Sequence, residues 1–378
     1  MLNALNELHP DEHYKFDSKE KELAEFMDHA KRVLEAQTVL AARHPGGNAD
    51  RVFHMKGHAC VAGVLRLFEN RPEKTRHGMF GVKAKSAYNV LARFSSGVGF
   101  TQHDLKPDVR GLALKIFGVN DGHDNARIVD FLLTNSTNPF ANDQEEFVSF
   151  MEATVNPGPL GAHLIKFMVE HSAVARLLIK ATLKVVPSLA SEQYWSGHAY
   201  LLGAHQAMKF NVRPVEDSRT ETDGERPEET TQLTAEAEMG GGKLQDQIKR
   251  WFELHTASNS KVNPDYLSVE LRNRLQRGPI KFIFSVQLAK GVQLTPIEDG
   301  LVEWKESDSP SIPVAELILD REVDANACRN LRFTPGHFVS DHRPLGNLGR
   351  GRIFAYEASQ DGRHAAIEEA QEQAFFSE

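Results

Sequence analysis

The chain has 378 residues, two cysteines and a formal net charge of −8. A hydrophobic share of 40% together with 25% charged residues is typical of a globular protein and argues against a disordered or fibrous chain. The acidic balance also argues against the broad basic face that nucleic-acid binding requires.

Three further expectations follow from the distribution of residues. The N-terminus lacks a basic segment followed by an apolar run, so we expect no signal peptide and a cytoplasmic location. The most apolar stretch, residues 159–187, is interrupted by lysine and arginine, so we expect no transmembrane span. Cys60 and Cys328 lie far apart in the sequence, and we expect two separate core residues rather than a disulfide or a metal site.

In chain order, the first predicted element is a helix from Lys19 to Ala42, where apolar residues recur at three- and four-residue spacing. Three strand patterns follow, namely Arg51 to Glu69, Tyr88 to Phe94 and Gly111 to Phe117. Helical periodicity returns between Glu146 and Ala190, and we predict a helix pair that covers the core. Its alternating basic residues leave a second interpretation open, a surface for lipid or an acidic substrate.

The second half begins with a segment from Glu216 to Glu238 that is rich in Glu, Thr and Asp, as in an exposed acidic loop. Residues 251–275 mix loop and helix, and two more strands are predicted, Ile280 to Leu288 and Val314 to Leu319. Sheet, helical insertion and sheet follow one another without regular βαβ alternation. This order predicts an α+β fold or a closed barrel.

The first motif that could carry chemistry is Arg51-Val52-Phe53-His54-Met55-Lys56-Gly57. Taken alone, a histidine beside apolar residues is usually a hydrogen-bonded core or surface group. His54 and His58 would share one face of a helix as zinc ligands, but Gly57 and the strand pattern oppose a helix, and no glutamate base follows. The sequence therefore disfavours zinc at this place.

Two later motifs are equally ambiguous alone. Arg93-Phe94-Ser95-Ser96, followed by the run from Asp108 to Lys115, fits an ordinary surface strand and turn. Near the C-terminus, Arg352 and Tyr356 are four residues apart, so on a helix their side chains are neighbours. A guanidinium there favours phenolate over phenol, and a phenolate binds ferric iron. A tyrosine beside a solvated arginine on a core helix is the alternative.

Together and in this order, the three motifs resemble the catalase superfamily. The distal-histidine segment of catalases, approximately R-V-x-H-A-K-G, matches Arg51 to Gly57 apart from Met55. The segments R-F-S-T and D-x-R-G-F-A-x-K-F resemble the second motif. Three later segments of this chain resemble successive elements of the catalase barrel, namely Asp265-Tyr266, Phe282 to Leu288 and Val314 to Asp320.

The resemblance spans residues 51–363 and leaves the helical insertion, about 146–190, and the acidic loop, about 216–238, largely outside. It implies a short catalase-related haem protein with a closed antiparallel β-barrel, a helical insertion and flanking helices. We accordingly divide the chain into an N-terminal helical arm, residues 1–50, and a haem-binding barrel domain, residues 51–378. The C-terminal domains and the NADPH site of larger catalases are expected to have no counterpart.

The resemblance also implies a haem b site and a role for each site residue. It places Tyr356 as the ligand of the iron, with Arg352 bonded to its oxygen. Other haem contacts are implied for Arg51, Arg93 and Arg363 on the propionates and for Phe147 on the ring.

On the distal side, His54 takes the place of the acid–base histidine and Ser95 that of the hydroxyl that orients its ring. The distal asparagine position of catalases holds Thr134 here, with Asn135 one residue later, and either could complete the pocket. A channel phenylalanine is replaced by Pro139. Because of these departures we do not expect efficient disproportionation of hydrogen peroxide.

The resemblance implies an oxidoreductase that takes part in the response to oxidative stress. Its activity would be that of a haem catalase or peroxidase acting on hydrogen peroxide or organic hydroperoxides. His54 would take a proton from the peroxide and return it to the leaving oxygen. Two alternatives stay open: a fatty-acid hydroperoxide isomerase or lyase resembling allene oxide synthases, and a non-catalytic haem binder. The sequence leaves homo-oligomer formation and peripheral contact of the insertion with lipid open as well.

Overall fold

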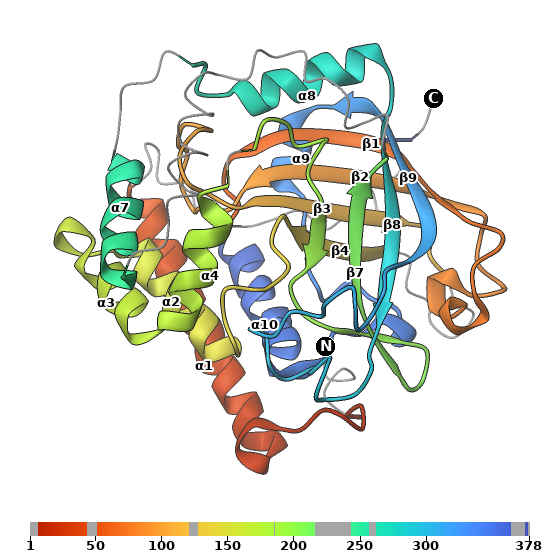
Figure 1. Ribbon diagram of the computed structural model, residues 1–378, viewed down its shortest axis with the longest axis horizontal. Helices are drawn as coiled ribbons and strands as arrows, with labels where there is room; N and C mark the ends of the chain where they lie inside the picture. The colour runs from red at the N-terminus through yellow and green to blue at the C-terminus, as the bar shows by residue number, and fades with distance from the viewer. Residues whose placement is uncertain are drawn as a thin grey trace.

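An antiparallel sheet closes on itself at the centre of the molecule (Figure 1). The computed structural model describes residues 7–43, 51–120, 128–184, 186–215, 243–256, 262–363 and 375–376. Within this part of the chain the strand order is β5-β4-β3-β2-β1-β9-β8-β7-β6, and β5 also pairs with β7. That last pairing closes eight strands into a barrel and leaves β6 attached to β7. The predicted closed antiparallel barrel is confirmed.

The strands agree with the prediction in part. Their bounds are β1 Gly57–Leu67, β2 Ala87–Ser96, β3 Arg110–Phe117, β4 Ile128–Thr134, β5 Tyr194–Ser196, β6 Tyr200–Leu202, β7 Gln206–Pro214, β8 Ile280–Leu288 and β9 Ile312–Val323. The prediction for β8 is confirmed to the residue. By contrast, β1 begins at Gly57 rather than Arg51, so the first motif lies in a loop before the strand. Strands β4 to β7 were not predicted, and two of them contain only three residues.

The helices gather mainly on one side of the barrel (Figure 1). Their bounds are α1 Lys19–Arg43, α2 Gln144–Val155, α3 Ala162–Glu170, α4 Ser172–Thr182, α7 Leu244–Thr256, α8 Tyr266–Arg277, α9 Ala325–Asn330 and α10 Gly346–Gly362. Short 3-10 turns occupy Lys15–Asp17, Glu73–Thr75, Gly78–Phe80, Pro159–Gly161 and Ser340–His342. The insertion forms three helices, α2, α3 and α4, rather than the predicted pair, because Gly158 and Gly161 adopt positive φ between α2 and α3. The predicted acidic loop lies outside the described residues.

The barrel encloses one apolar core. Its centre is a group of phenylalanine rings from separate strands, in which Phe131 and Phe210 lie 4.6 Å apart, and Phe284 packs 5.2 Å from Phe131. Successive residues of a strand point to opposite faces, so alternate residues of the same strands face outward. On β1, Val61 belongs to the interior, whereas Cys60 and Ala62 belong to a separate cluster outside the barrel. This outward face is available to form a site.

The two cysteines form a disulfide, so the expectation of two separate core residues is wrong. Cys60 lies on β1 and Cys328 on α9, and 268 residues separate them in the sequence. The fold packs α9 against β1 and brings the two Cα atoms to 6.0 Å, a distance that disulfides span. Separation along the chain therefore gave no information about separation in space.

A buried ion cluster joins the N-terminal segment to α10. Arg350 is completely buried, and its guanidinium donates to the carboxylates of Glu12 and Glu22. The carbonyl oxygen of His13 also accepts from it, at 3.0 Å. Because a buried charge without a partner is costly, this cluster fixes the start of the chain against α10.

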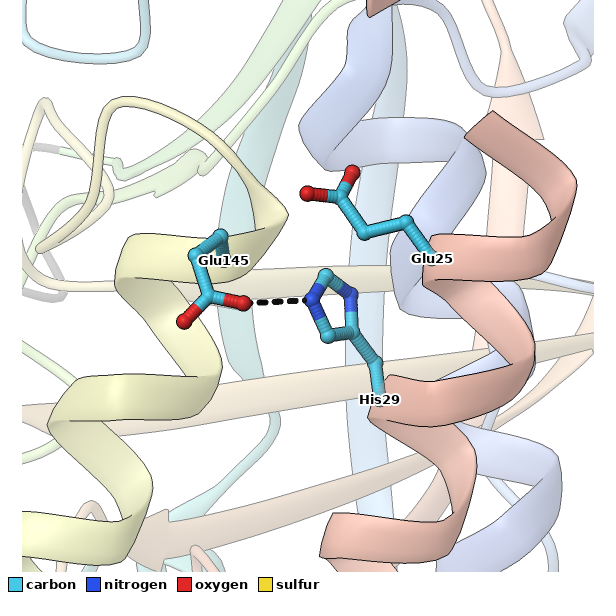
Figure 2. A group of neighbouring side chains, drawn as sticks. All are labelled: Glu25, His29 and Glu145. Atoms are coloured by element: carbon cyan, nitrogen blue, oxygen red, sulfur yellow. Dashed lines mark hydrogen bonds and ion pairs between the residues drawn. The ribbon is translucent and has the colours of Figure 1, made fainter. Parts of the chain in front are cut away.

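Polar contacts also join α1 to α2, as Figure 2 shows for His29 and Glu145. His29 Nε2 lies 2.8 Å from Glu145 Oε2, and Arg32 donates to the same oxygen at 2.7 Å. Arg32 also donates to both oxygens of Glu152, at 2.8 and 2.7 Å. None of the helices that the structure describes is both long enough and apolar enough to cross a membrane.

Candidate functional site

A large cavity lies between the outer face of the barrel and the helices. Its volume is about 1350 Å³, and most of its surface is apolar. It collects residues from all three sequence motifs. The predicted site residues on its wall are Arg51, His54, Arg93, Ser95, Thr134, Phe147, Arg352, Tyr356 and Arg363.

The strand register builds the barrel side of this cavity. Ser95 on β2 pairs with Gly111 on β3, and Gly111 pairs with Thr134 on β4. Residues opposite each other in a sheet point to the same face. Ser95 and Thr134 therefore flank a position at which the sheet carries no side chain.

The ring of His54 occupies the space that Gly111 leaves. A Cβ atom on Gly111 would come within 2.5 Å of the imidazole, far closer than a carbon contact allows. The Nδ1 atom of His54 lies 3.0 Å from Ser95 Oγ, which leaves Nε2 as the ring nitrogen without that contact.

The backbone at His54 is held in an unusual conformation. Its φ is 59°, in the left-handed region that costs a residue with a Cβ atom free energy. The amide of His54 donates to the carbonyl of Gly97 at 2.8 Å, and Arg93 donates to the carbonyl of His54 at 2.7 Å. These bonds fix the backbone on both sides of the ring.

The surroundings of His54 keep its ring neutral. Burial, followed by the guanidinium groups of Arg93, Arg352 and Arg51, lowers the pKa of His54 to about 3. A neutral imidazole that faces a cavity presents a nitrogen lone pair that can accept a hydrogen bond or a proton from a molecule bound there.

Thr134 and Asn135 are placed differently. Thr134 lines the cavity, and its hydroxyl makes one long contact of 3.5 Å with the carbonyl of Ser136. The amide of Asn135 donates to Glu192 at 2.9 Å and accepts from the backbone of Arg110 at 2.7 Å. Asn135 is absent from the cavity wall. Of the two predicted residues, the structure brings only Thr134 to His54.

A second pair of polar side chains on the cavity wall, Arg352 and Tyr356, comes from α10. Arg352 and Tyr356 lie one turn apart, and Arg352 Nη2 donates to the phenol oxygen at 2.8 Å, as the four-residue spacing predicts. Arg352 Nη1 lies 3.0 Å from Nδ1 of His198. Burial disfavours the charge of Arg352, yet the phenols of Tyr356 and Tyr200 favour it enough to raise its pKa. The phenol therefore faces a permanent cation.

Three further arginines surround the cavity. Arg51 donates to the carbonyls of Cys328 and Leu331, at 3.1 and 3.0 Å, and Arg363 donates to the same Leu331 carbonyl at 2.8 Å. Arg93 bonds to the loop that carries His54. Phe147, from α2, packs 5.6 Å from the ring of Phe53 and 5.9 Å from the guanidinium of Arg352. Cations and aromatic faces thus share one concave surface.

Two contributors were not identified from the sequence. His198 is buried, and burial together with the charge of Arg352 holds its pKa well below the ordinary value. Its partner Arg352 lies 154 residues away, so no local pattern could reveal the pair. Gly111 lies in the second motif, but the sequence does not show that it leaves room for the ring of His54. That role follows from the pairing of β2, β3 and β4, which a local sequence pattern does not reveal.

A group of possible metal ligands lies elsewhere, between α1 and α2. Glu25, His29 and Glu145 bring one ligand atom each within 4.8 Å of one another (Figure 2). Lys15 already bonds to Glu25 at 2.9 Å, and Arg32 bonds to Glu145 at 2.7 Å. Because two cations neutralise these carboxylates, we assign the group to helix packing.

No family model matches the sequence. The chain is 27% identical over 292 residues to a catalase-related peroxidase of Mycolicibacterium paratuberculosis, a match that covers 72% of this chain and 77% of the relative.

Solved catalases share the fold. A fungal catalase superposes with a TM-score of 0.63 at 16% identity over 84% of this chain, and catalase A of Saccharomyces cerevisiae with 0.62 at 16% over 84%. A bacterial catalase gives 0.62 at 18% identity over 86%. The chain spans 59 to 61% of the length of these catalases. The chain therefore has the catalase fold.

Proposed function

We propose that this protein is a haem-dependent peroxidase of the catalase-related type that acts on hydrogen peroxide or organic hydroperoxides. One observation carries the proposal: the Arg352–Tyr356 pair and the His54–Ser95 pair face a single cavity. The 27% identical relative, a catalase-related peroxidase, supports the same chemistry.

The residues present suit haem b. A phenol oxygen beside a guanidinium is a good ligand for ferric iron, and tyrosine is an established axial ligand of haem. Arg51, Arg93 and Arg363 offer forked donors for two propionates, and Phe147 offers an aromatic face. At about 1350 Å³ the cavity is also larger than the roughly 300–1,000 Å³ of an ordinary ligand site. In this proposal Tyr356 would hold the iron, and Arg352 would hold the oxygen of Tyr356.

When bound, the haem would supply the oxidising chemistry. The protein's own residues transfer the protons. We assign the imidazole proton to Nδ1, which then donates to Ser95 and leaves Nε2 as the acceptor. His54 takes the proton of the hydroperoxide at Nε2 and gives it to the leaving oxygen as the O–O bond breaks. The hydroxyl of Thr134 orients the peroxide.

The overall reaction requires two electrons. One hydroperoxide, two protons and two electrons give one alcohol and one water, and an organic electron donor such as a phenol supplies the electrons. Arg352 donates to the Tyr356 oxygen at 2.8 Å and so holds that oxygen in place. No electron donor is needed for the isomerase alternative, in which the hydroperoxide rearranges.

The test uses purified protein reconstituted with haemin. We expect a ferric haem spectrum and peroxide-dependent oxidation of a phenolic donor. Replacing His54 by Gln should lower the turnover number about 10²–10⁴-fold while haem stays bound, because only the proton transfer is lost. His77→Gln, at an exposed histidine away from the cavity, is the matched control.

The alternatives give different results in the same experiment. A rearranged product without donor oxidation, found by mass spectrometry, would favour the isomerase. Haem uptake without any spectral response to peroxide would favour the non-catalytic haem binder. Failure of the protein to bind haemin would refute the proposal.

A further inference from the structure

A second, smaller cavity lies on the outside of the barrel, against β7. Its volume is about 320 Å³, near the lower end of the roughly 300–1,000 Å³ of ordinary ligand sites. It shares no lining residue with the large cavity. We call it the β7 pocket and define it by Gln193, Trp195, Lys209, Arg213, Glu303 and Trp304, which all line it. None of these residues has a part in the proposed function.

The alternation of side chains along β7 brings two cations to this pocket. Phe210 and Val212 belong to the barrel core, so Lys209 and Arg213 point to the outer face of the sheet. Lys209 is only 6% exposed, whereas Arg213 is exposed. The lysine therefore lies at the inner end of the pocket and the arginine nearer its mouth.

The pairing of the buried lysines distinguishes Lys209 from the others. Three lysines of the described residues are buried, and two of them have a carboxylate partner. Lys56 lies 2.6 Å from Asp104, and Lys115 lies 2.8 Å from Asp130. Lys209 forms no hydrogen bond or ion pair with any residue that the structure describes. Since buried charges in proteins are normally paired, Lys209 lacks the partner that the other two possess.

The surroundings of Lys209 exclude water without replacing this partner. Its ammonium lies 5.3 Å from the centre of the Trp304 ring, and the indole N–H of Trp304 is already bonded to the carbonyl of Pro296 at 3.1 Å. Burial lowers the pKa of Lys209 to about 8, although the charges of Glu303 and Asp299 act to raise it. A carboxylate placed beside the ammonium would supply the pairing that this buried cation lacks.

Aromatic surface lies beside the same cation. Trp304 is buried and Trp195, on β5, is half-buried, and both line the pocket. Contact between aromatic rings contributes more than the burial of their area alone, so two indoles favour a flat ring as their neighbour. The volume of the pocket suits a ligand with one such ring.

We propose that the β7 pocket binds a small carboxylate with one aromatic ring, of which benzoate is the simplest representative. The carboxylate pairs with Lys209, and the ring lies beside Trp304 and Trp195. Arg213 attracts the anion at the mouth of the pocket. This inference does not depend on the proposed function, because the haem site is assigned to the other cavity.

The first test is calorimetry on the haem-loaded protein at pH 7, with benzoate, acetate and benzamide as probes. Benzoate should bind at least about tenfold more tightly than the other two, because acetate lacks the ring and benzamide lacks the charge. Lys209→Met should lower the affinity for benzoate at least about tenfold, since it removes the cation that pairs with the carboxylate.

A neighbouring lysine provides the matched control. Lys305 follows Trp304 in the chain, is exposed and does not line the pocket, so Lys305→Met should keep the affinity for benzoate within about twofold. Urea denaturation checks the fold of the variants. Lys209→Met should leave the urea midpoint unchanged or raise it, because no carboxylate loses a partner. Lys115→Met should lower the midpoint, since Asp130 then loses its lysine.

Proton uptake on binding gives a readout specific to the lysine. With a pKa of about 8, Lys209 is about half protonated at pH 8, so benzoate should bring about half a proton with it at pH 8 and little at pH 6.5. Calorimetry in buffers of different ionisation enthalpy measures this uptake. Glu303, Asp299 and His198 also interact with the charge of Lys209. Lys209→Arg separates the lysine from them, because it keeps the charge at all these pH values and should abolish the uptake.

Each result decides for or against the β7 pocket. Weaker benzoate binding in Lys209→Met but not in Lys305→Met, together with proton uptake at pH 8, supports the proposal. It is wrong if acetate or benzamide binds as tightly as benzoate, or if Lys209→Met binds benzoate as the wild type does, which would place benzoate elsewhere. A lowered urea midpoint in Lys209→Met would assign the lysine to the stability of the fold instead. Peroxidase assays test the proposed function separately.

Discussion

The two walls of the cavity are built on different principles. On the barrel side, Ser95, Gly111 and Thr134 occupy one row across three strands, and hydrogen bonds hold His54 above it. On the helical side, Leu164, Leu178 and Ile248 offer only apolar surface. The two walls therefore differ in what defines them, because strand register and hydrogen bonds fix the polar groups of the barrel wall, whereas the helical wall is defined by apolar packing.

The largest expected effect is at the base of the site. Tyr356→Phe removes the oxygen proposed as the iron ligand, so the ferric haem spectrum should change and peroxidase activity should fall to background. Optical spectroscopy and steady-state assays measure both. Tyr200→Phe is the matched control, because the hydroxyl of Tyr200 is buried and has no hydrogen-bond partner among the described residues. Unchanged iron coordination in Tyr356→Phe would contradict the assignment.

The second-largest effect is expected at Gly111, the central residue of the row formed by Ser95, Gly111 and Thr134. Gly111→Ala places a methyl group where the ring of His54 lies, so the ring must shift. A displacement of about 1 Å can reduce a rate about 10²-fold, and we expect a loss of that size in kcat. Gly336→Ala adds the same group away from His54, with its nearest neighbours 3.3 Å away. Equal activity of the two variants would show that register does not position His54.

A smaller effect is expected where the barrel wall is joined to α9. Cys60 pairs with Arg93 across β1 and β2, and its disulfide holds the segment whose carbonyls bind Arg51. Replacing both cysteines by Ser should lower the free energy of unfolding by about 2–4 kcal/mol, measured by urea denaturation. Wild type treated with a reductant should show the same loss. No change in either sample would mean that the disulfide does not stabilise the fold.

The smallest effect is expected from pH. Because the pKa of His54 is lowered to about 3, the ring stays neutral from pH 8 to pH 5, and kcat/KM should lose little from its titration. With a pKa of 6.5 the neutral fraction at pH 5 would be about 30-fold smaller. Burial raises the pKa of Asp108, another cavity residue, to about 6, so the profile is measured in Asp108→Asn as well. An inflection near pH 6.5 that persists in Asp108→Asn would contradict a neutral His54.

The same contrast explains how much could be predicted from the sequence. The helix from Lys19, the strand from Ile280 to Leu288 and the Arg352–Tyr356 pair depend on local periodicity, and the structure agrees with each. Contacts between residues far apart in the sequence leave no local pattern from which they could be predicted. The pairing of His198 with Arg352 and the disulfide both depend on the closed barrel, which brings distant segments together.

The choice between Thr134 and Asn135 shows the same limit at a single residue. The sequence left Thr134 and Asn135 both open, because it does not show which of two adjacent residues points into the cavity. One residue of shift in a strand exchanges the two faces. The register of β3 with β4 puts Thr134 beside Gly111, and Asn135 bonds instead to Glu192 and Arg110.

The buried cluster around Arg350 has a consequence for making shorter versions of this protein. A truncated chain that started after Glu22 would keep every strand of the barrel, yet the buried guanidinium of Arg350 would lose Glu12 and Glu22 and keep Glu298, at 3.6 Å. Losing the partners of a buried charge costs about 3–5 kcal/mol, comparable to the whole stability margin of many domains. The residues up to Glu22 therefore neutralise a charge buried in α10, and a shortened version of this protein has to retain them.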